Sequence, residues 1–367
     1  MYSKNIYKDC TNEKLEAISE FCESYKDFIS YGKTERLCVE QAVKAAEQNG
    51  FINLDSIIND NTSNKVVLKP GSKVYAVNKN KNVILFRIGS KPLTSGMRIL
   101  GAHIDSPRLD VKQNPLYQKS DFALLDTHYY GGIKKYQWVT IPLAIHGVVI
   151  KKSGETINVN IGESDTDPVV GISDLLIHLS ADQLTKPAAK VIEGEALDLT
   201  IGSIPLKDEE KDAVKKNVLK LLKDKYDFDE EDFLSAELEI VPAGKARDYG
   251  LDRSMVAGYG HDDRVCAYTS LRAILDSENP EETSCCVLVD KEEIGSVGAT
   301  GAQSKYFEDI VALLLNELGY TSYIDLKKAM SNSKMLSSDV SAGYDPLFES
   351  VNDPKNAAYF NKGIVFN

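Results

Sequence analysis

The sequence has no long apolar run. Its longest apolar stretch, from Trp138 to Ile150, is interrupted by Pro142 and His146 and is too short to cross a bilayer. The N-terminal residues are polar and no apolar segment follows them, which argues against a signal peptide. We therefore expect a soluble cytoplasmic protein.

The sequence also has no excess of positive charge and no cysteines at the spacing of a C-x-x-C motif. The 367 residues carry a formal net charge of −12, which argues against nucleic acid or an anionic membrane as a partner. The six cysteines show no C-x-x-C spacing, so we expect reduced thiols rather than disulfides or metal ligands. The glycine-rich run after Glu293 is not followed by Gly-Lys-Ser/Thr, which weakens its interpretation as a phosphate-binding loop.

Helical and strand patterns alternate at both ends of the chain. Apolar residues three and four apart predict helices, and short apolar runs predict strands. The helices are expected over residues 11–30, 34–50, 262–276 and 304–314, and the strands over 73–77, 83–88, 97–102, 284–290 and 334–337. Such alternation predicts a mostly parallel sheet with functional residues at the carboxyl ends of its strands.

The middle of the chain has a different character. Between about Leu109 and Glu239, strand-like segments mix with a charged helix and acidic surface, and no catalytic constellation is visible. A hydrophobic content of 43% is enough for two domains. We predict an α/β catalytic domain in two pieces, residues 1–108 and 241–367, interrupted by a β-rich domain over residues 109–240.

His103 and Asp105 directly follow the predicted strand 97–102. In an extended chain, side chains two residues apart project to the same side. The carboxylate is therefore placed to fix the orientation of a metal-binding imidazole. Taken alone, the pair is explained more simply as a histidine at a strand end with an aspartate that stabilises the next turn.

Asp262 and Asp263 stand at the start of a predicted helix. The helix dipole alone would explain either carboxylate. The functional alternative is that one of them bridges two cations, which lie about 3.5–4 Å apart in two-metal sites. For Asp263 the simpler role is preferred, in which it orients its neighbours or pairs with Arg264.

Glu292 and Glu293 follow the predicted strand 284–290. Consecutive residues cannot do the same job on one face, so one is expected to bind a cation while the other moves the proton of an attacking water. A solvated Glu-Glu pair in a loop is the alternative. The apolar strand before them and the small residues after them favour a site, because small residues let a substrate approach the backbone.

Asp339 follows a further strand pattern, and by itself it would suit a turn or a helix cap. Four separate positions along the chain each offer a suitable metal ligand, and such a coincidence is unlikely by chance. Carboxylates with one imidazole suit Zn²⁺ or Mn²⁺. The residues together therefore predict a metallohydrolase.

At these positions the sequence strongly resembles the aspartyl aminopeptidases, the M18 family of dinuclear zinc exopeptidases. The resemblance covers most of the chain, and its markers are Ala-His-Ile-Asp-Ser-Pro at 102–107, Asp-Asp-Arg at 262–264, Glu-Glu-Ile-Gly-Ser at 292–296 and Ser-Asp at 338–339. It implies a zinc-exopeptidase-like catalytic domain that removes N-terminal Asp or Glu from peptides. It also implies two zinc ions per subunit, with Mn²⁺ or Co²⁺ as alternatives.

The resemblance assigns a role to each marker residue. The implied metal-binding residues are His103 and Asp339 for one ion, Glu293 for the second, and Asp262 as the bridge between the ions. Glu292 is the implied general base, and Asp105 orients the metal site.

The resemblance also implies residues for substrate binding and an assembly. Lys362 corresponds to a lysine that meets the acidic side chain of the substrate, although it also suits an ordinary surface lysine. His178 resembles a histidine that reaches into the active site of a partner subunit, although a histidine at the edge of a core is nearly as good an account. Residues 109–240 would mediate dimerisation, and the dimers would build a large tetrahedral homo-oligomer.

The sequence departs from the family pattern at its C-terminal end. The family supplies one more metal-binding histidine there, whereas none of the five histidines of this sequence follows Asp262. The second ion would then have only Asp262 and Glu293, fewer than the three protein ligands usual at a catalytic zinc. The sequence ends in a strand pattern over residues 363–367, and we expect it to be incomplete at this end.

This departure leaves two alternatives to an aspartyl aminopeptidase. One is a non-catalytic homologue that binds or assembles through its insertion. The other is an aminopeptidase of broader specificity on the same scaffold.

Overall fold

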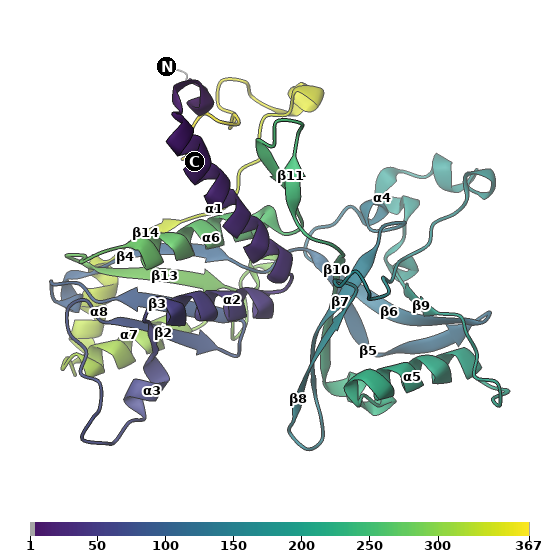
Figure 1. Ribbon diagram of the computed structural model, residues 1–367, viewed down its shortest axis with the longest axis horizontal. Coiled ribbons are helices and arrows are strands. Elements are labelled where there is room, and N and C mark those ends of the chain that lie inside the picture. The colour runs from purple at the N-terminus through teal and green to yellow at the C-terminus, as the bar shows by residue number, and fades with distance from the viewer. Residues whose placement is uncertain (1–3, 367) are drawn as a thin grey trace.

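Two six-stranded sheets organise the molecule, and each forms the centre of one lobe (Figure 1). The computed structural model describes residues 4–366. The first sheet has the order β1-β2-β3-β13-β4-β14. Its strands are β1 (Ile52–Asn53), β2 (Lys73–Asn78), β3 (Asn82–Arg87), β13 (Thr283–Val289), β4 (Met97–His103) and β14 (Lys334–Ser337).

Helices cover both faces of this first sheet. They are α1 (Asn12–Tyr31), α2 (Glu35–Gln48) and α6 (His261–Asp276) on one face, and α3 (Leu54–Ile58), α7 (Tyr306–Glu317) and α8 (Tyr323–Asn332) on the other. Because side chains alternate along a strand, Leu85 of β3 packs into the first core and Phe86 into the second. Burial on both faces explains why this strand is a continuous apolar run.

The predicted α/β class is confirmed, and the first two helices begin close to where they are expected. The Thr11 side chain caps α1 by accepting a hydrogen bond from the Lys14 amide, and Thr34 caps α2 in the same way through the Leu37 amide. The sheet is mostly parallel, as expected, but it also contains antiparallel pairings. β13 is parallel to β4, and β4 to β14, whereas β3 is antiparallel to both of its neighbours.

The second lobe is an antiparallel sheet in the order β8-β7-β10-β5-β6-β9. Its strands are β5 (Arg108–Lys119), β6 (Phe122–Tyr130), β7 (Leu143–Ile150), β8 (Thr156–Ile161), β9 (Leu199–Gly202) and β10 (Ala236–Pro242). Helix α5 (Ala213–Tyr226) packs Val214 and Val218 into its core, and the short helix α4 (Ala188–Val191) lies near its far end. The sheet runs from Arg108 to Pro242, and the domain limits 1–108, 109–240 and 241–367 stay a prediction.

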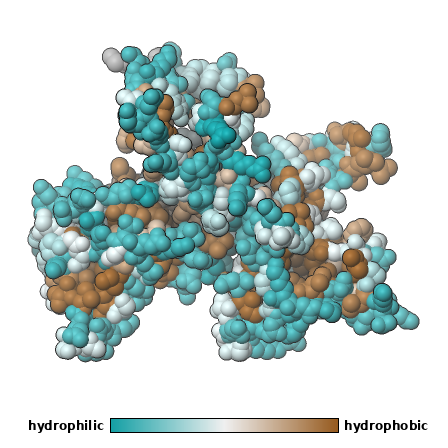
Figure 2. All heavy atoms as spheres, in the orientation of Figure 1, coloured by the Kyte–Doolittle hydropathy of each residue, from teal (hydrophilic) through white to brown (hydrophobic). Residues whose placement is uncertain are grey.

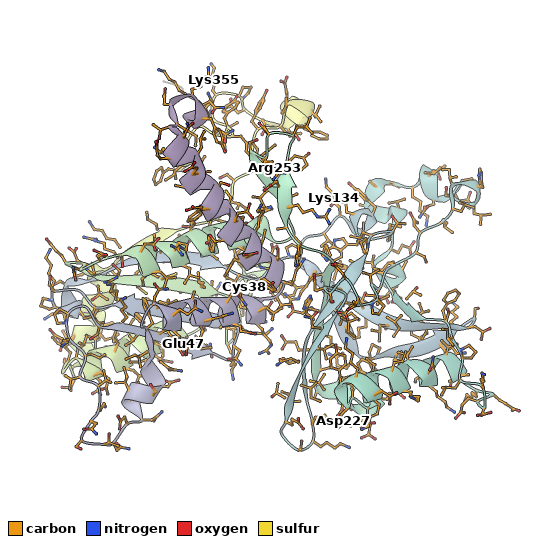
Figure 3. All side chains as sticks on the ribbon, viewed as in Figure 1. Cys38, Glu47, Lys134, Asp227, Arg253 and Lys355 are labelled. Atoms are coloured by element: carbon orange, nitrogen blue, oxygen red, sulfur yellow. The ribbon has the colours of Figure 1, made fainter. Side chains whose placement is uncertain are left out.

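A hairpin and the C-terminal segment lie at the same end of the first lobe. The hairpin is formed by β11 (Arg247–Tyr249) and β12 (Met255–Ala257). Figure 3 shows Arg253 of the hairpin and Lys355 of the C-terminal segment at the top of the view, above Cys38 and Glu47. The strand expected over residues 363–367 does not form over 363–366, and Asn367 lies outside the described residues.

A helix that crosses a membrane must be both long and apolar. Within residues 4–366, no helix is both long enough and apolar enough to cross a bilayer.

Candidate metal centre

His103 is the last residue of β4, and only 3% of its surface is exposed. Its Nδ1 lies 2.9 Å from the backbone oxygen of Asp105 and 3.3 Å from the Asp105 Oδ1 atom. A proton on Nδ1 is therefore well placed to be donated to Asp105. This leaves Nε2 as the atom that faces the other acidic groups and is available to a metal ion.

Carboxylates from three other chain segments surround the His103 Nε2 atom. The distances are 3.1 Å to Asp262 Oδ1, 3.8 Å to Glu292 Oε2 and 3.9 Å to Asp339 Oδ1. These residues are far apart in the sequence, so the fold itself brings them together.

Strand register explains most of this convergence. β13 lies parallel beside β4 with Val289 opposite His103, and β14 lies on the other side with Ser337 opposite Gly101. All three strands end at the same edge of the sheet, where the chain continues into Glu292 or Asp339. Functional groups in open α/β sheets are expected at this edge.

Asp262 reaches the same edge from the start of α6. The Ser106 hydroxyl donates a hydrogen bond of 2.6 Å to the backbone oxygen of Asp262. The Arg264 Nε atom donates to the backbone oxygen of Ile104 at 3.1 Å, which ties the first turn of α6 to the end of β4. Asp262 and Asp263 have non-helical backbone angles, so the regular helix predicted from Asp262 begins only after them.

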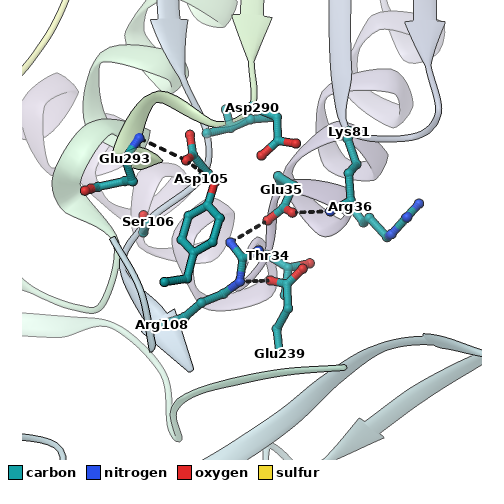
Figure 4. Close-up of polar contacts among 12 residues, drawn as sticks. Thr34, Glu35, Arg36, Lys81, Asp105, Ser106, Arg108, Glu239, Asp290 and Glu293 are labelled. Carbon is teal, nitrogen blue, oxygen red and sulfur yellow. Dashed lines mark hydrogen bonds and ion pairs between the residues drawn. The ribbon is translucent and has the colours of Figure 1, made fainter. Parts of the chain in front are cut away.

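Asp105 is completely buried and makes contacts on every side (Figure 4). Its carboxylate accepts hydrogen bonds from the Tyr130 hydroxyl at 2.7 Å and from the backbone amides of Glu292 at 3.1 Å and Glu293 at 3.2 Å. Burial acts to raise the pKa of Asp105, but its interactions with His103 and Tyr130 outweigh burial and the pKa lies below its ordinary value. Asp105 is therefore an anion that holds its neighbours in place.

Two groups of side chains have ligand atoms close enough to share a metal ion. One group is His103, Asp262 and Glu293, and the other is His103, Asp263 and Asp339, with the ligand atoms of each within 4.8 Å of one another. Nitrogen and carboxylate oxygen donors in this number suit zinc. The chemistry of the donors therefore fits a metal centre.

The electrostatics of the site also fit a cation. Burial raises the pKa of Asp263 and of Glu293 to about 7. Both carboxylate oxygens of Asp263 are buried, and among the described residues their only hydrogen-bonding neighbour is the Cys266 thiol. Burial acts to lower the pKa of His103, but its hydrogen bond with Asp105 outweighs burial and raises the pKa from 6.5 to about 9. A bound cation would replace the protons that these groups otherwise take up.

A third acidic group is an ion-pair cluster rather than a metal site. Glu35, Glu237 and Glu239 also lie within 4.8 Å of one another. Cationic side chains already contact each of them, at 2.7 Å from Lys81 to Glu35 and 3.3 Å from Arg108 to Glu239 (Figure 4). Arg36 contacts Glu237 at 2.9 Å. This cluster lies where the two lobes meet.

A cavity of about 380 Å³ opens beside the candidate centre. Its lining includes His103, Glu292, Ser296, Ser338 and Asp339. This volume lies within the range of about 300–1,000 Å³ that small-molecule sites occupy. Carboxylates and a histidine thus meet a space large enough for a small part of a peptide.

The structure does not bring the two predicted substrate-binding residues to this edge. His178 is exposed in the turn Ile177–Leu179 of the second lobe. Lys362 is half-buried in the C-terminal segment, which contacts the start of the chain through a 2.9 Å hydrogen bond from the Ile6 amide to the Asn361 oxygen. Within residues 4–366, neither of them lines the cavity described above.

Sequence reasoning missed two residues that the structure places at the centre. Asp263, assigned only a supporting role, is buried beside His103 and Asp339. Tyr130 comes from β6 of the second lobe and carried no motif. The adjacent aspartates at 262–263 were the only signal for the first, and we find no sequence signal for the second.

Comparisons with known proteins agree with this geometry. A family model described as aminopeptidase I zinc metalloprotease (M18) matches residues 28–367. A probable M18 family aminopeptidase 1 from Clostridium acetobutylicum is 57% identical over 365 residues, which are 99% of this chain and 78% of that protein. The crystal structure of an M18 family aminopeptidase from Thermotoga maritima has a TM-score of 0.91 and 41% identity, and the match covers 99% of this chain and 78% of that one.

A more distant solved structure has the same fold. The mApe1 dodecamer of S. cerevisiae has a TM-score of 0.71 and 21% identity, and the match covers 92% of this chain and 75% of that one.

Proposed function

The chain belongs to the M18 family of zinc metalloprotease aminopeptidases, and we propose that it removes N-terminal Asp or Glu from peptides with the help of two metal ions. One observation carries the proposal. Four separate segments deliver His103, Asp262, Glu292–Glu293 and Asp339 to one edge of the first sheet, beside a cavity.

We assign the metal-binding residues as follows. His103 and Asp339 would hold one ion, Glu293 the other, and Asp262 would bridge the two. The closeness of Asp263 to His103 and Asp339 supports an additional contribution from Asp263 to the first ion. Zinc supplies Lewis-acid polarisation of the scissile carbonyl and lowers the pKa of a bound water.

Glu292 is the proposed general base. Its side chain is about half exposed, lines the cavity and places Oε2 at 3.8 Å from the His103 Nε2 atom. A carboxylate at this position can accept the proton of the attacking water and return it to the leaving amine. Asp105 would act through His103 by holding the imidazole in one orientation.

The variant E292Q tests the proposal. Glutamine keeps the size of the side chain but cannot accept the proton, so we expect hydrolysis of an N-terminal Asp chromogenic substrate to fall by at least about 10²-fold. Bound zinc should stay unchanged. The assay is run with Zn²⁺ or Mn²⁺ and with an EDTA control.

The matched control for E292Q is E278Q, because Glu278 is exposed and makes no hydrogen bond or ion pair among the described residues. E278Q should behave as wild type. An active E292Q enzyme would refute the assignment of the base, and a wild type that binds zinc but hydrolyses no peptide would refute the function.

Selection of acidic substrates is assigned to Lys362 and, from a partner subunit, to His178. A cation is needed for this selection because the protein as a whole is acidic. Self-association through residues 109–240 would bring such a histidine from a second copy. Four exposed apolar side chains, Leu175, Leu176, Ile177 and Leu179, flank His178 and support this association, because a contact between copies would cover them.

A broader aminopeptidase is the second candidate. It is favoured by one observation, namely that within residues 4–366 Lys362 does not line the cavity beside the candidate metal centre. Rates on otherwise identical substrates with N-terminal Asp, Glu or Leu separate the two candidates. A clear preference for Asp and Glu supports the first, and equal rates support the second.

A further inference from the structure

We propose that Tyr130, a residue of the second lobe, is a positioning residue for the metal centre of the first lobe. This inference rests on the proposed metallopeptidase site. Tyr130 is the last residue of β6 and is 7% exposed, while its target Asp105 follows β4. The 2.7 Å hydrogen bond from the Tyr130 hydroxyl to the Asp105 Oδ2 atom therefore crosses from one lobe to the other.

The target of this hydrogen bond supports three parts of the site. Asp105 Oδ1 accepts from the Glu292 amide at 3.1 Å and lies 3.3 Å from the His103 Nδ1 atom. Asp105 Oδ2 accepts from the Glu293 amide at 3.2 Å in addition to the Tyr130 hydroxyl. A rotation of this one carboxylate would move the imidazole and both glutamates together.

The Tyr130 hydroxyl is the only side-chain O–H among the described residues that donates to Asp105. Because Asp105 is completely buried, bulk water is not at hand to replace a lost donor. Groups that orient metal ligands in this way typically change metal affinity or activity about 10–100-fold when they are mutated.

Tyr130 is itself held in place. The Arg108 guanidinium carbon lies 3.8 Å from the centroid of the Tyr130 ring. Arg108 in turn contacts Glu35 of α2 at 3.4 Å and Glu239 of β10 at 3.3 Å, within the ion-pair cluster between the lobes (Figure 4). The ring is thus fixed by charges from both lobes, which makes its hydroxyl a rigid donor.

The next residue of the same strand end also approaches the centre. Gly131 has a positive φ of 73°, and a Cβ atom at this position would lie 3.2 Å from both the Cβ and the Oε2 atoms of Glu293. The end of β6 therefore contacts the site at two points, through Tyr130 on Asp105 and through Gly131 on Glu293. The geometry assigns this strand end a supporting role for the metal ligands.

The variant Y130F removes only the hydroxyl and leaves the ring over Arg108. The matched control is Y117F, because the Tyr117 hydroxyl also donates to a carboxylate, that of Asp198, but within the second lobe. Zinc affinity is measured by competition with a chelator, and ligand geometry by the absorption spectrum of the Co²⁺-substituted protein. kcat and KM are measured at saturating zinc, and thermal unfolding checks the fold.

We expect Y130F to bind zinc about 10–100-fold more weakly, to have a shifted Co²⁺ spectrum and to lose kcat with little change in KM. Y117F should match wild type in zinc affinity, Co²⁺ spectrum, kcat and KM. Equal zinc affinity and equal spectra for Y130F and Y117F would overturn the inference.

A second pair of variants covers the case that Y130F does not fold. G131A pushes on Glu293 without removing a hydrogen bond, while G132A adds a methyl group into open space. Weaker zinc binding by G131A alone would support the supporting role of this strand end, and identical zinc binding by the pair would overturn that role.

The tests also separate this inference from the proposed function. Zinc binding without hydrolysis by wild type would overturn the function alone, because the affinity and spectra still test Tyr130. No zinc binding by wild type would overturn both.

Discussion

At the residue scale, Asp263 is the group whose chemistry depends most on its surroundings. It is completely buried, and burial raises its pKa from 3.8 to about 7. Among the described residues, only the Cys266 thiol lies within hydrogen-bonding reach of its carboxylate. A folded-state pKa above the ordinary value means that folding takes up a proton between these two pH values. The metal-free protein should therefore lose stability as pH rises from about 4 to about 7.

The variant D263N removes this titration. In the metal-free protein, wild type should lose about 2–3 kcal/mol of its free energy of unfolding between pH 5 and pH 8 through Asp263, since each pKa unit is worth about 1.4 kcal/mol. D263N should not show this loss, so its stability relative to wild type should be higher at pH 8 than at pH 5. With zinc bound, D263N should instead be less stable than wild type, because Asp263 is proposed to contribute to binding the ion. Denaturant unfolding with and without EDTA measures both effects.

The control for D263N is D208N, because Asp208 is exposed and makes no hydrogen bond or ion pair among the described residues. D208N should have the same free energy of unfolding as wild type at pH 5 and at pH 8. The same dependence of stability on pH in D263N and wild type would contradict the argument.

The sequence was informative for residues that follow strands. His103, Glu292 and Asp339 were identified because each stands just beyond a strand pattern. The structure places the carboxylates of Glu292 and Asp339 within 3.9 Å of the His103 Nε2 atom. The division of labour between Asp262 and Asp263 could not be predicted, because it depends on burial. Tyr130 could not be predicted either, since its partner is set by the packing of two lobes.

At the scale of elements, the loop from Lys291 to Gly301 carries both glutamates. A Cβ atom at Gly301 would lie 2.2 Å from the backbone oxygen of Ser296, across the neck of this loop. The variant G301A should therefore displace Glu292 and Glu293 and reduce kcat by about 10-fold or more, because small misplacements of catalytic groups are costly.

Kinetics at saturating zinc and thermal unfolding test this expectation. G132A is the control, because its added methyl group meets open space. Full activity of G301A would show that the loop tolerates displacement, and equal losses in both variants would show that the effect is not specific to the loop.

Helix and strand positions were predictable where local signals exist. Thr11 and Thr34 mark the starts of α1 and α2, and the apolar runs gave β3, β4 and β13 to within a few residues. Strand order was not predictable, because β13 lies between β3 and β4 and this pairing joins segments far apart in the sequence. The antiparallel pairing of β3 with β13 could not be predicted for the same reason.

At the scale of the whole molecule, the family and the fold class expected from sequence are confirmed. The positions of Lys362 and His178 relative to the site were not predictable, since they depend on how the C-terminal segment and the second lobe lie. Cytoplasmic location and the tetrahedral assembly stay predictions.

Self-association should depend on the exposed apolar turn around His178. Figure 2 shows a hydrophobic patch at the far end of the second lobe. In the turn around His178, Leu176 is 61% and Leu179 is 73% exposed. The double variant L176D/L179D should have a lower molar mass in size-exclusion chromatography with light scattering, because a charge in an apolar interface is costly.

The control is V67D, which adds charge at a side chain of the first lobe that is 79% exposed. It should associate as wild type does. An unchanged molar mass for L176D/L179D would contradict a role of this turn in assembly.

The order of the strands has a consequence for synthesis on the ribosome. β3 and β4 leave the ribosome with a gap between them, and β13, which fills it, begins roughly 180 residues after His103. At about 5–20 residues per second, the gap persists for roughly 10–40 s. The second lobe, whose sheet is continuous from Arg108 to Pro242, can close in that interval. The nascent chain therefore cannot assemble the candidate metal centre until translation has passed Asp339.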